Sequence, residues 1–347
     1  MKKTVKLLIM TVLCLGFAIP ASAGYKEIEV RPGELAGWFD YSAYQAGISG
    51  AAPADVLEGY NIWMNTRETL GPNGDYTYAG EPIIPNSRVD CNNCHVGGGL
   101  VPFADPVYQS SRKWAAPKYW RANNEYTDLR HRIIRCLANC DGGVWVPREH
   151  EVVDYLTAYV EWVGSLVTDP AMQSDYTQMP GVSRTMDGFS NWKNMSADRN
   201  RGAELYDDEC RTCHGRRGRG EPADNIPPLW GNSSIPQTAL GGLSVPGIAR
   251  FIRANMPLGD EWSFSAQDAL DVAAYFTSKS RLHNPVGDTY YSHIGPEGIP
   301  NVYYKNITWV IGPKAADDPF ADDQRRFGPW KPIEDWQIQR QQELINP

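Results

Sequence analysis

Apolar residues recur at helical spacing in two similar stretches of this chain. The first stretch covers residues 56–64, and the second covers residues 198–212 and begins at Asp198 as a predicted N-cap. Each pattern places one apolar face along a helix, which predicts that both helices pack against a core. The apolar positions are Val56, Leu57, Tyr60, Trp63 and Met64 in the first stretch and Ala203, Leu205 and Tyr206 in the second.

A further amphipathic pattern closes each half of the chain. Residues 152–163 predict one closing helix and residues 270–276 predict the other, which Ser265 and Asp268 open as a capping pair. The apolar positions are Val152, Val153, Leu156, Tyr159, Val160 and Val163 in the first and Leu270, Val272, Ala273, Tyr275 and Phe276 in the second.

Segments rich in Pro, Gly, Ser and Asp separate and follow these patterns. Residues 168–191 suit a linker between domains, and beyond Arg281 the chain turns irregular with scattered aromatic residues. We therefore divide the mature chain into a first domain over residues 24–175, a linker and second domain over 176–283, and an irregular tail over 284–347 that wraps the surface.

Each half also contains the string Cys-x-x-Cys-His, at residues 91–95 and 210–214. This string attaches haem c, because its two thiols add to the vinyl groups and its His ligates the iron. The alternative of a zinc site would need two cysteine pairs to converge, with no His required after each. We expect two covalently bound haem c groups, attached through Cys91, Cys94, Cys210 and Cys213, with His95 and His214 as iron ligands.

Helix, haem string, loop-rich middle and closing helix follow one another in both halves. This order is the layout of a small cytochrome c domain. The sequence therefore predicts an all-α fold of two tandem cytochrome c domains with an irregular C-terminal tail.

The first residues have the features of an export signal. Three lysines precede an apolar stretch over residues 7–20, and a cleavage site of the A-x-A kind ends at Ala23. We interpret residues 1–23 as a signal peptide. The stretch is too short for a comfortable membrane span, and no later stretch is long enough. We therefore expect the mature protein to be soluble in the bacterial periplasm and not to span the membrane.

The charge of the chain limits its partners. The formal net charge is −8, and loss of the three leader lysines makes the mature chain more acidic still. Nucleic acid is therefore not expected as a partner, since its binding depends on phosphate neutralisation by Lys and Arg. A basic redox protein, or a partner that is not steered by charge, fits better.

The second iron ligand of each haem decides its chemistry. Met256 lies 42 residues after His214 in a loop before the closing helix, and a thioether ligand suits electron transfer. The matching position in the first half is Cys136, which lies 41 residues after His95. A thiolate there would lower the potential, and it is also a nucleophile.

A disulfide is the alternative role for Cys136. Cys136 and Cys140 are the cysteines of the mature chain that the haems do not use, and spare thiols of exported proteins tend to pair. On a regular helix the two positions lie at the edge of disulfide geometry. The segment Asp141–Gly143 ends the helix and permits some distortion, so the residues alone leave both roles open.

Positive charge gathers near Cys136 in an otherwise acidic chain. Arg121, Arg130, Arg132 and Arg135 lie within about four helical turns of sequence, and Arg132 is one turn from Cys136 on the same face. Guanidinium groups lower the pKa of a thiol and bind sulfur oxyanions bidentately. The alternative is a solvated basic helix face.

Together these features resemble the dihaem thiosulfate dehydrogenase family of periplasmic sulfur-oxidising bacteria. The resemblance runs along most of the mature chain and includes both haem strings and the segment that carries Cys136. Its pieces are Asn65-Thr66, Leu70–Pro72, Cys91–Gly99 with Pro102, Ala104 and Pro106, Arg132–Cys136, Pro227–Gly231, Asn255–Gly259, Asp271–Tyr275, Asp318–Phe320 and Phe327–Ile333.

The resemblance implies two cytochrome c domains that interconvert thiosulfate and tetrathionate. It implies that His95 and Cys136 ligate the active-site haem, and that Cys136 carries a covalent thiosulfate adduct during turnover. It also implies that Arg132 binds the sulfur oxyanion, and it gives Arg121 as a further candidate.

The second haem, by the same resemblance, passes electrons out to a soluble or membrane-associated redox protein. Its ligands would be His214 and Met256.

One residue departs from the family pattern. The family commonly has serine four residues after the axial cysteine, and here that residue is Cys140. A second sulfur at this place could form a resting disulfide, change the sulfur substrate or modify the ligand chemistry, so Cys140 joins the candidate site. The rival hypothesis is a non-catalytic electron-transfer cytochrome with a structural Cys136–Cys140 disulfide, and a peroxidase has no support in the sequence.

Overall fold

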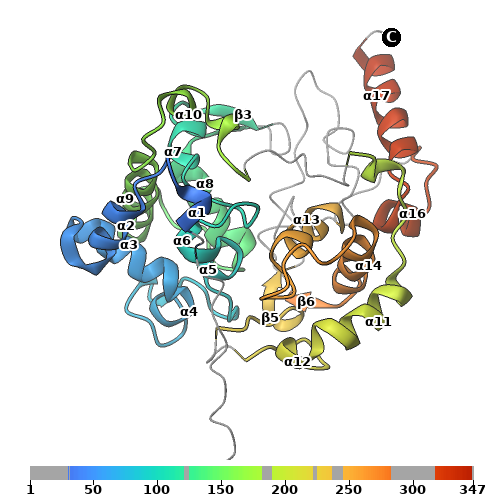
Figure 1. The fold of residues 1–347 in the computed structure, drawn as a ribbon, viewed down its shortest axis with the longest axis horizontal. Helices are drawn as coiled ribbons and strands as arrows, with labels where there is room; N and C mark the ends of the chain where they lie inside the picture. The colour runs from blue at the N-terminus through green and yellow to red at the C-terminus, as the bar shows by residue number, and fades with distance from the viewer. Residues whose placement is uncertain are drawn as a thin grey trace, which may run out of the picture.

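The computed structural model describes residues 30, 32–120, 125–181, 190–221, 225–236, 245–282 and 317–345 (Figure 1). Helices form most of the regular structure in these residues, as the sequence predicts. Small two-stranded sheets accompany them, and the hydrophobic pattern does not predict these. Within the same residues no helix is long and apolar enough to cross a bilayer. The predicted signal peptide and Arg121 lie outside the described residues.

The first region of the fold, up to residue 181, is built around the crossing of two helices. These are α3 (Ala54–Met64) and α9 (Glu151–Ser165), which the first pair of apolar patterns predicts correctly. They approach closely because Gly59 has no side chain. A Cβ atom at this position would lie 2.1 Å from the carbonyl oxygen of Tyr155.

Shorter elements surround this crossing and carry the candidate site residues. The helices are α1 (Pro32–Leu35), α2 (Tyr41–Ala46), α4 (Thr66–Thr69), α5 (Cys91–Cys94), α6 (Val96–Gly99), α7 (Ser110–Lys113), α8 (Leu129–Arg135) and α10 (Pro170–Ser174). The antiparallel strand pairs are β1 (Thr77–Tyr78) with β2 (Glu81–Pro82) and β3 (Lys118–Trp120) with β4 (Glu125–Thr127).

The second region repeats the helix crossing. Helix α11 (Arg199–Glu209) begins at the predicted N-cap Asp198, and α14 (Ala266–Thr277) begins at the predicted capping box. Gly202 permits their contact, since a Cβ atom there would lie 1.9 Å from the carbonyl oxygen of Asp271. The other elements are α12 (Arg211–His214), β5 (Gly231–Pro236), α13 (Val245–Asn255) and β6 (Arg281–Leu282), with β5 and β6 parallel.

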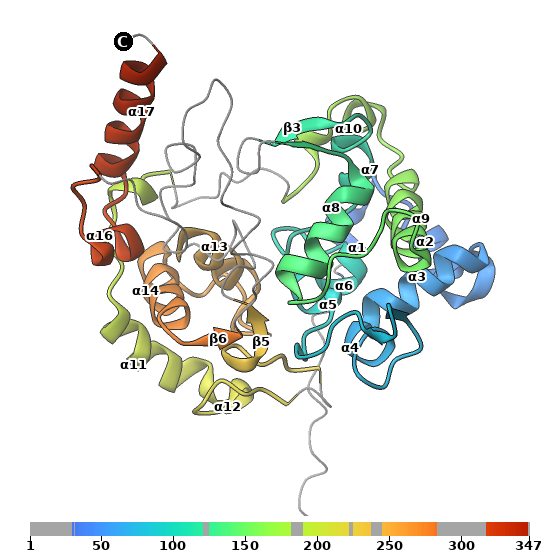
Figure 2. The same cartoon turned by 180° about the vertical axis from the view of Figure 1, so that it is seen from behind.

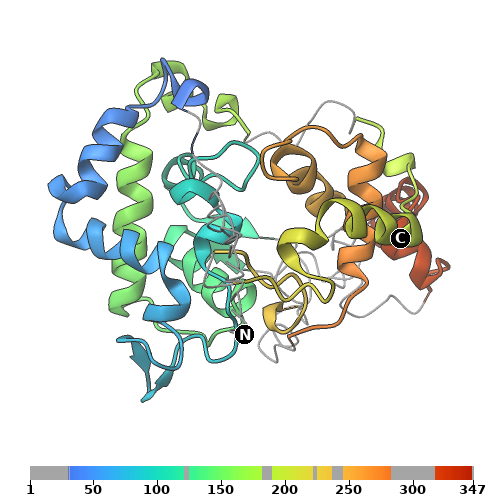
Figure 3. The ribbon, with the colours of Figure 1, turned by 60° about the horizontal axis from the view of Figure 1, so that its bottom comes forward.

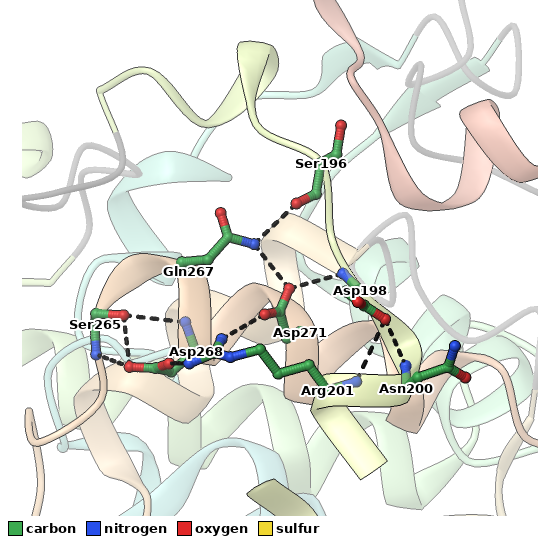
Figure 4. A network of polar contacts seen from close by, with 8 residues as sticks. All are labelled: Ser196, Asp198, Asn200, Arg201, Ser265, Gln267, Asp268 and Asp271. Carbon is green, nitrogen blue, oxygen red and sulfur yellow. Dashed lines mark hydrogen bonds and ion pairs between the residues drawn. The ribbon is translucent and has the colours of Figure 1, made fainter. Parts of the chain in front are cut away.

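A polar network fixes the second crossing at one end (Figure 4). The buried carboxylate of Asp271 accepts hydrogen bonds from the Asp198 amide at 2.7 Å and from the Gln267 side chain at 2.8 Å. Arg201 forms ion pairs with both Asp271 and Asp268. The network ties the first turn of α11 to the first turn and a half of α14.

The end of the chain corrects the predicted irregular tail. Residues 317–345 contain helices α16 (Asp322–Phe327) and α17 (Lys331–Ile345). Trp330 and Ile333 are fully buried in the core of the second region, and the Trp330 amide donates to the Lys193 carbonyl at 2.7 Å. The Pro- and Gly-rich composition before this segment does not extend into it. Trp330 and Ile333 give the segment an apolar face that packs into the core. Residues 283–316 lie outside the described residues.

Each region has its own main core, and smaller apolar clusters connect the two regions. One cluster of buried apolar side chains lies within residues 35–179, and another lies within residues 245–333. Elements up to α10 and those from α11 onward lie side by side in Figures 2 and 3. At the contact, the Arg88 amide donates to the Ser233 carbonyl at 2.8 Å. The domain boundaries given above remain predictions.

Candidate active site

The first Cys-x-x-Cys-His string forms helix α5, and its start is fixed by a capping box. The buried Asp90 carboxylate caps the helix and also accepts a hydrogen bond from the Arg67 amide at 2.8 Å. The Cys91 amide donates to the Thr66 hydroxyl at 3.0 Å. Cys91 and Cys94 are free, partly buried thiols one turn apart, as attachment to a single porphyrin requires.

Three left-handed glycines follow the proximal histidine and turn the chain sharply. Gly97, Gly98 and Gly99 have φ angles of 63°, 69° and 82°, which residues with a Cβ atom rarely adopt. The Tyr159 hydroxyl of α9 donates to the Gly98 carbonyl at 2.7 Å. The helix crossing of the first region thereby positions the segment that carries His95.

The backbone also orients the imidazole of His95. Its Nδ1 atom contacts the backbone carbonyl of Asp105. Because a carbonyl only accepts, this contact favours the tautomer with the proton on Nδ1, which leaves Nε2 as the ligating atom. Sequence reasoning missed this role of Asp105, since a backbone carbonyl leaves no signature in the residue type.

Helix α8 leads to Cys136 and ends in a wider turn. Asp128 caps α8 by accepting from the His131 amide at 2.9 Å, and Arg148 pairs with the same carboxylate. Residues Cys136–Cys140 form one π-helical turn, closed by a hydrogen bond of 3.1 Å from the Asp141 amide to the Cys136 carbonyl. Such turns are frequent at functional sites.

The two sulfurs of this turn are neighbours but are not bonded. The Sγ atoms of Cys136 and Cys140 lie 3.8 Å apart, almost twice the length of a disulfide, and both cysteines are free. The Cys140 thiol donates a hydrogen bond to Cys136. In this structure the second cysteine therefore supports the first as a hydrogen-bond donor and leaves it available.

Electrostatics around Cys136 favour its thiolate. The hydrogen bond from Cys140 lowers the pKa of Cys136 well below the ordinary value, and this effect exceeds the opposing effect of burial. The charge of Arg132 lowers the same pKa further, and its Nη1 atom donates to the Cys136 sulfur at 2.8 Å. Arg132 and Cys136 therefore share one face of the helix, as predicted.

His95 also contacts Cys136, which brings together two residues that are far apart in sequence. Burial alone would lower the pKa of His95, but its hydrogen bond with Cys136 and the charge of Asp105 raise that pKa above its ordinary value. The structure thus brings the predicted proximal and distal residues of the first half into direct contact, and their roles as iron ligands stay predictions.

Cys140, which is partly buried, and Asp141, which is buried, complete the surroundings of Cys136. The hydrogen bond to Cys136 and burial raise the pKa of the Cys140 thiol, which keeps its proton for donation. Burial and the charge of Cys136 raise the pKa of Asp141 well above its ordinary value. Sequence reasoning treated Asp141 only as a helix-ending residue.

The other predicted arginines do not all reach this place. Arg130 donates to the Asp154 carboxylate of α9 at 2.5 Å and also to the Arg148 carbonyl, so it is committed to another contact. Arg135 is buried. Of the described arginines in the predicted cluster, Arg132 is the one that donates to the Cys136 sulfur.

The second Cys-x-x-Cys-His string has more open surroundings. Cys210 ends α11 and is partly buried, whereas Cys213 in α12 is exposed. Burial lowers the pKa of His214, against a smaller opposing contact with the Pro227 carbonyl. Met256 follows the last residue of α13 and, like Cys210, packs against the second core.

The donor sets of both strings fit haem c. The first provides two free thiols, an oriented imidazole and a cysteine that favours its thiolate. The second provides two free thiols, a partly buried imidazole and, on the core of the same region, the Met256 thioether. These are the attachment and axial groups of c-type cytochromes.

Comparisons with known proteins identify similar cytochromes and thiosulfate dehydrogenases. The family profile "Cytochrome C oxidase, cbb3-type, subunit III" matches residues 197–276, the part that holds the second string. The thiosulfate dehydrogenase of Stutzerimonas stutzeri is 29% identical over 233 residues, or 66% of this chain and 68% of that protein. The chain is related to the thiosulfate dehydrogenases.

Other members of that group give a similar result. The thiosulfate dehydrogenase of Psychrobacter arcticus is 26% identical over 60% of this chain and 61% of its own length. The solved structure of the TsdBA thiosulfate dehydrogenase from Marichromatium purpuratum, as isolated, has a TM-score of 0.52 and 27% identity, covering 64% of this chain and 45% of that one. These similarities and the two Cys-x-x-Cys-His strings support an oxidoreductase of the c-type cytochrome kind that holds haem c.

Proposed function

We propose that this protein is a periplasmic dihaem cytochrome that interconverts thiosulfate and tetrathionate at Cys136. The relatives named above are thiosulfate dehydrogenases, and the donor set of each string suits one haem c. The observation that carries the proposal is the thiolate environment of Cys136, which receives hydrogen bonds from Arg132 and Cys140.

Eight residues would hold the two cofactors. Cys91, Cys94, His95 and Cys136 would hold the first haem c, and Cys210, Cys213, His214 and Met256 would hold the second. When bound, the two haems supply two one-electron acceptors, which matches the two electrons released when two thiosulfates join.

Cys136 acts as the sulfur that forms and releases the new bond. Its thiolate joins the outer sulfur of one thiosulfate, and the S–S bond forms with loss of two electrons to give a cysteine S-thiosulfonate. The outer sulfur of a second thiosulfate then attacks that adduct, which releases tetrathionate and restores the thiolate. Attack of a thiolate on a sulfur–sulfur bond is ordinary exchange chemistry, and the reverse sequence reduces tetrathionate.

Arg132 provides the positive charge that a doubly negative substrate needs in an acidic protein. Its guanidinium already donates to the Cys136 sulfur at 2.8 Å, so its remaining N–H groups are within reach of a sulfonate on that sulfur. The partly buried position of both side chains strengthens this attraction relative to bulk water.

Cys140 keeps its thiol protonated and donates to Cys136, which is the task a serine hydroxyl would perform at the same place. The Cys140→Ser variant should therefore retain activity, whereas Cys140→Ala should lose the hydrogen bond. Loss of one bond to a charged sulfur should lower the potential of the first haem by about 50 mV, as 59 mV is a tenfold change for one electron.

The decisive experiment is a steady-state assay of the purified dihaem protein in both directions. We expect thiosulfate-dependent electron release and tetrathionate-dependent oxidation, together with the electron paramagnetic resonance signal of thiolate-ligated low-spin ferric haem. A non-catalytic electron-transfer cytochrome with a Cys136–Cys140 disulfide would show neither the two activities nor the resonance signal of thiolate ligation. Thiolate ligation without either activity would point instead to another sulfur compound as substrate.

A further inference from the structure

A short loop directly after His214 carries an unusual concentration of positive charge. The segment Gly215–Gly220 alternates glycines with Arg216, Arg217 and Arg219, and all three arginines are exposed. The chain as a whole has a formal charge of −8, so this cationic surface contrasts with its background. The haem chemistry described above does not use these residues.

The backbone of this loop is held firmly while its side chains face outward. The Gly220 amide donates to the His214 carbonyl at 3.1 Å, and the Leu229 amide donates to the Gly218 carbonyl at 2.7 Å. The Tyr206 hydroxyl of α11 donates to the Gly215 carbonyl at 2.7 Å. These bonds connect the position of the arginines to that of the proximal histidine.

Glycine is required in the loop for its shape. Gly215, Gly218 and Gly220 have positive φ angles, and a Cβ atom at Gly218 would lie 2.3 Å from the Trp230 ring. The Lys279 ammonium lies 5.7 Å from the centre of the same ring. A fourth positive charge therefore borders the loop on the Trp230 side.

The three arginines are available for an outside partner. In the part of the chain that the structure describes, none of them forms an ion pair, and together with Gly215 they line a surface hollow. Arg211 differs, since it pairs with Asp207 at 2.7 Å. Acidic residues of the last turn of α11 precede the string, so the cationic loop has a mixed border.

We propose that Arg216, Arg217 and Arg219 form the docking surface for an acidic one-electron redox protein. The charge of this loop should decide the choice of partner more than the net charge of the chain does, because charges more than about 10 Å away contribute little at 0.1 M salt. The proposed partner is therefore acidic, whereas the net charge of the chain favours a basic one. One electron would pass from the reduced second haem to the oxidised partner in each encounter.

The chemistry of the neighbouring residues favours a redox protein over a membrane surface. Cys213, which would attach one edge of the second haem, is exposed next to the loop, so a docked partner would lie near the site of electron exit. Polybasic membrane-binding segments generally contain about four to eight Lys or Arg in one cluster, more than this loop holds. The proposal requires the second haem c but does not depend on the thiosulfate chemistry.

The test measures binding of the fully oxidised holoprotein, without turnover, by isothermal titration calorimetry. The probes are the acidic soluble domain of cytochrome b5 and, as the opposite charge, basic mitochondrial cytochrome c. We expect binding to the acidic probe that weakens at least about 10-fold between low and physiological salt. The charge-reversed variant R216E/R217E/R219E should weaken it by at least about 10-fold more, and R216Q/R217Q/R219Q by an intermediate factor.

The matched control is R216K/R217K/R219K, which keeps the charge and should bind within about 3-fold of the native protein. Unchanged binding in the Glu variant, or a preference of the native protein for the basic probe, would overturn the proposal. So would charge-dependent binding to vesicles with about 30% phosphatidylglycerol in the absence of binding to the acidic probe. An altered spectrum of the second haem in all three variants, with partner binding intact, would assign the arginines to the haem instead.

Discussion

The two Cys-x-x-Cys-His strings have the same residue pattern but lie in different surroundings. In the first, both cysteines are partly buried and His95 faces Cys136, whose thiolate Arg132 and Cys140 stabilise. In the second, Cys213 is exposed, and exposed arginines follow the histidine. Both strings would hold the same cofactor. By our proposals, the residues around the first would bind a small anion and those around the second a redox partner.

We expect the largest effect when the first region receives the methionine that is the expected ligand of the second region. We expect Cys136→Met to lower thiosulfate oxidation by about 10³-fold or more, because a thioether cannot form and release an S–S bond. The potential of the first haem should rise in the same variant. Steady-state kinetics and a redox titration, on protein with both haems verified, measure the two effects.

A turnover close to that of the native protein in Cys136→Met would show that the nucleophile lies elsewhere. Met256→Leu is the matched change in the second region. It should leave the thiolate signal of the first haem unchanged, so an equal loss of that signal in both variants would contradict the division of roles.

A second pair of variants tests what the two regions share. Gly59→Ala and Gly202→Ala should each lower the free energy of unfolding by about 3 kcal/mol, because the added methyl group meets backbone of the partner helix. Urea unfolding of the holoprotein measures this. Gly33→Ala is the control, since its Cβ atom would meet nothing within 4 Å. Equal stability of all three variants would show that the crossings have room to spare.

The next effect in size concerns the binding of thiosulfate, which we expect to depend on Arg132 of the first region. Arg132→Gln should raise KM for thiosulfate about 10- to 100-fold, as a hydrogen bond to a charged group contributes about 1.5–3 kcal/mol. Arg132→Lys should recover only part of this, since it keeps the charge but loses the planar fork. The control is Arg130→Gln, because Arg130 is committed to Asp154, and its KM should stay within about 2-fold. A similar rise in KM for both would indicate a diffuse field rather than a binding residue.

The smallest expected effect concerns acid and the helix that presents Cys136. The hydrogen bond from Arg148 lowers the pKa of Asp128 to about 2. Since the folded pKa lies below the unfolded one, this stabilisation is present above about pH 4 and is lost as pH falls towards 2. Asp128→Asn keeps the helix cap but should cost about 1 kcal/mol at pH 7, a value reduced for solvent screening.

Urea unfolding at a series of pH values checks that prediction. The difference between native protein and Asp128→Asn should disappear near pH 2. A difference that persists unchanged at that pH would attribute the loss to packing rather than to the ion pair.

The sequence predicted those features that depend on residue type and spacing. The four apolar patterns became α3, α9, α11 and α14, and the Asp198 cap and the Ser265–Asp268 box were confirmed. The i, i+4 spacing likewise placed Arg132 on Cys136. These features are local, so the chain encodes them directly.

Other features depend on tertiary contacts that no local pattern records. The Asp105 carbonyl that orients His95 and the separation of the Cys136 and Cys140 sulfurs both depend on how distant segments fold together. The C-terminal helices escaped prediction because the Pro- and Gly-rich composition before them suggested a continuous irregular tail. Ligation by Cys136 and Met256 stays a prediction.

The buried Trp330 has a consequence for any attempt to isolate the second region. Its ring lies tilted against the Trp192 ring with centroids 5.6 Å apart, and its indole N–H donates to the Arg325 carbonyl at 3.1 Å. A protein cut after the last strand would lose this side chain and expose the hollow it fills, at a cost of about 3–5 kcal/mol. The core of the second region therefore includes residues from the end of the chain, and a shortened version of this region should retain residues 317–345.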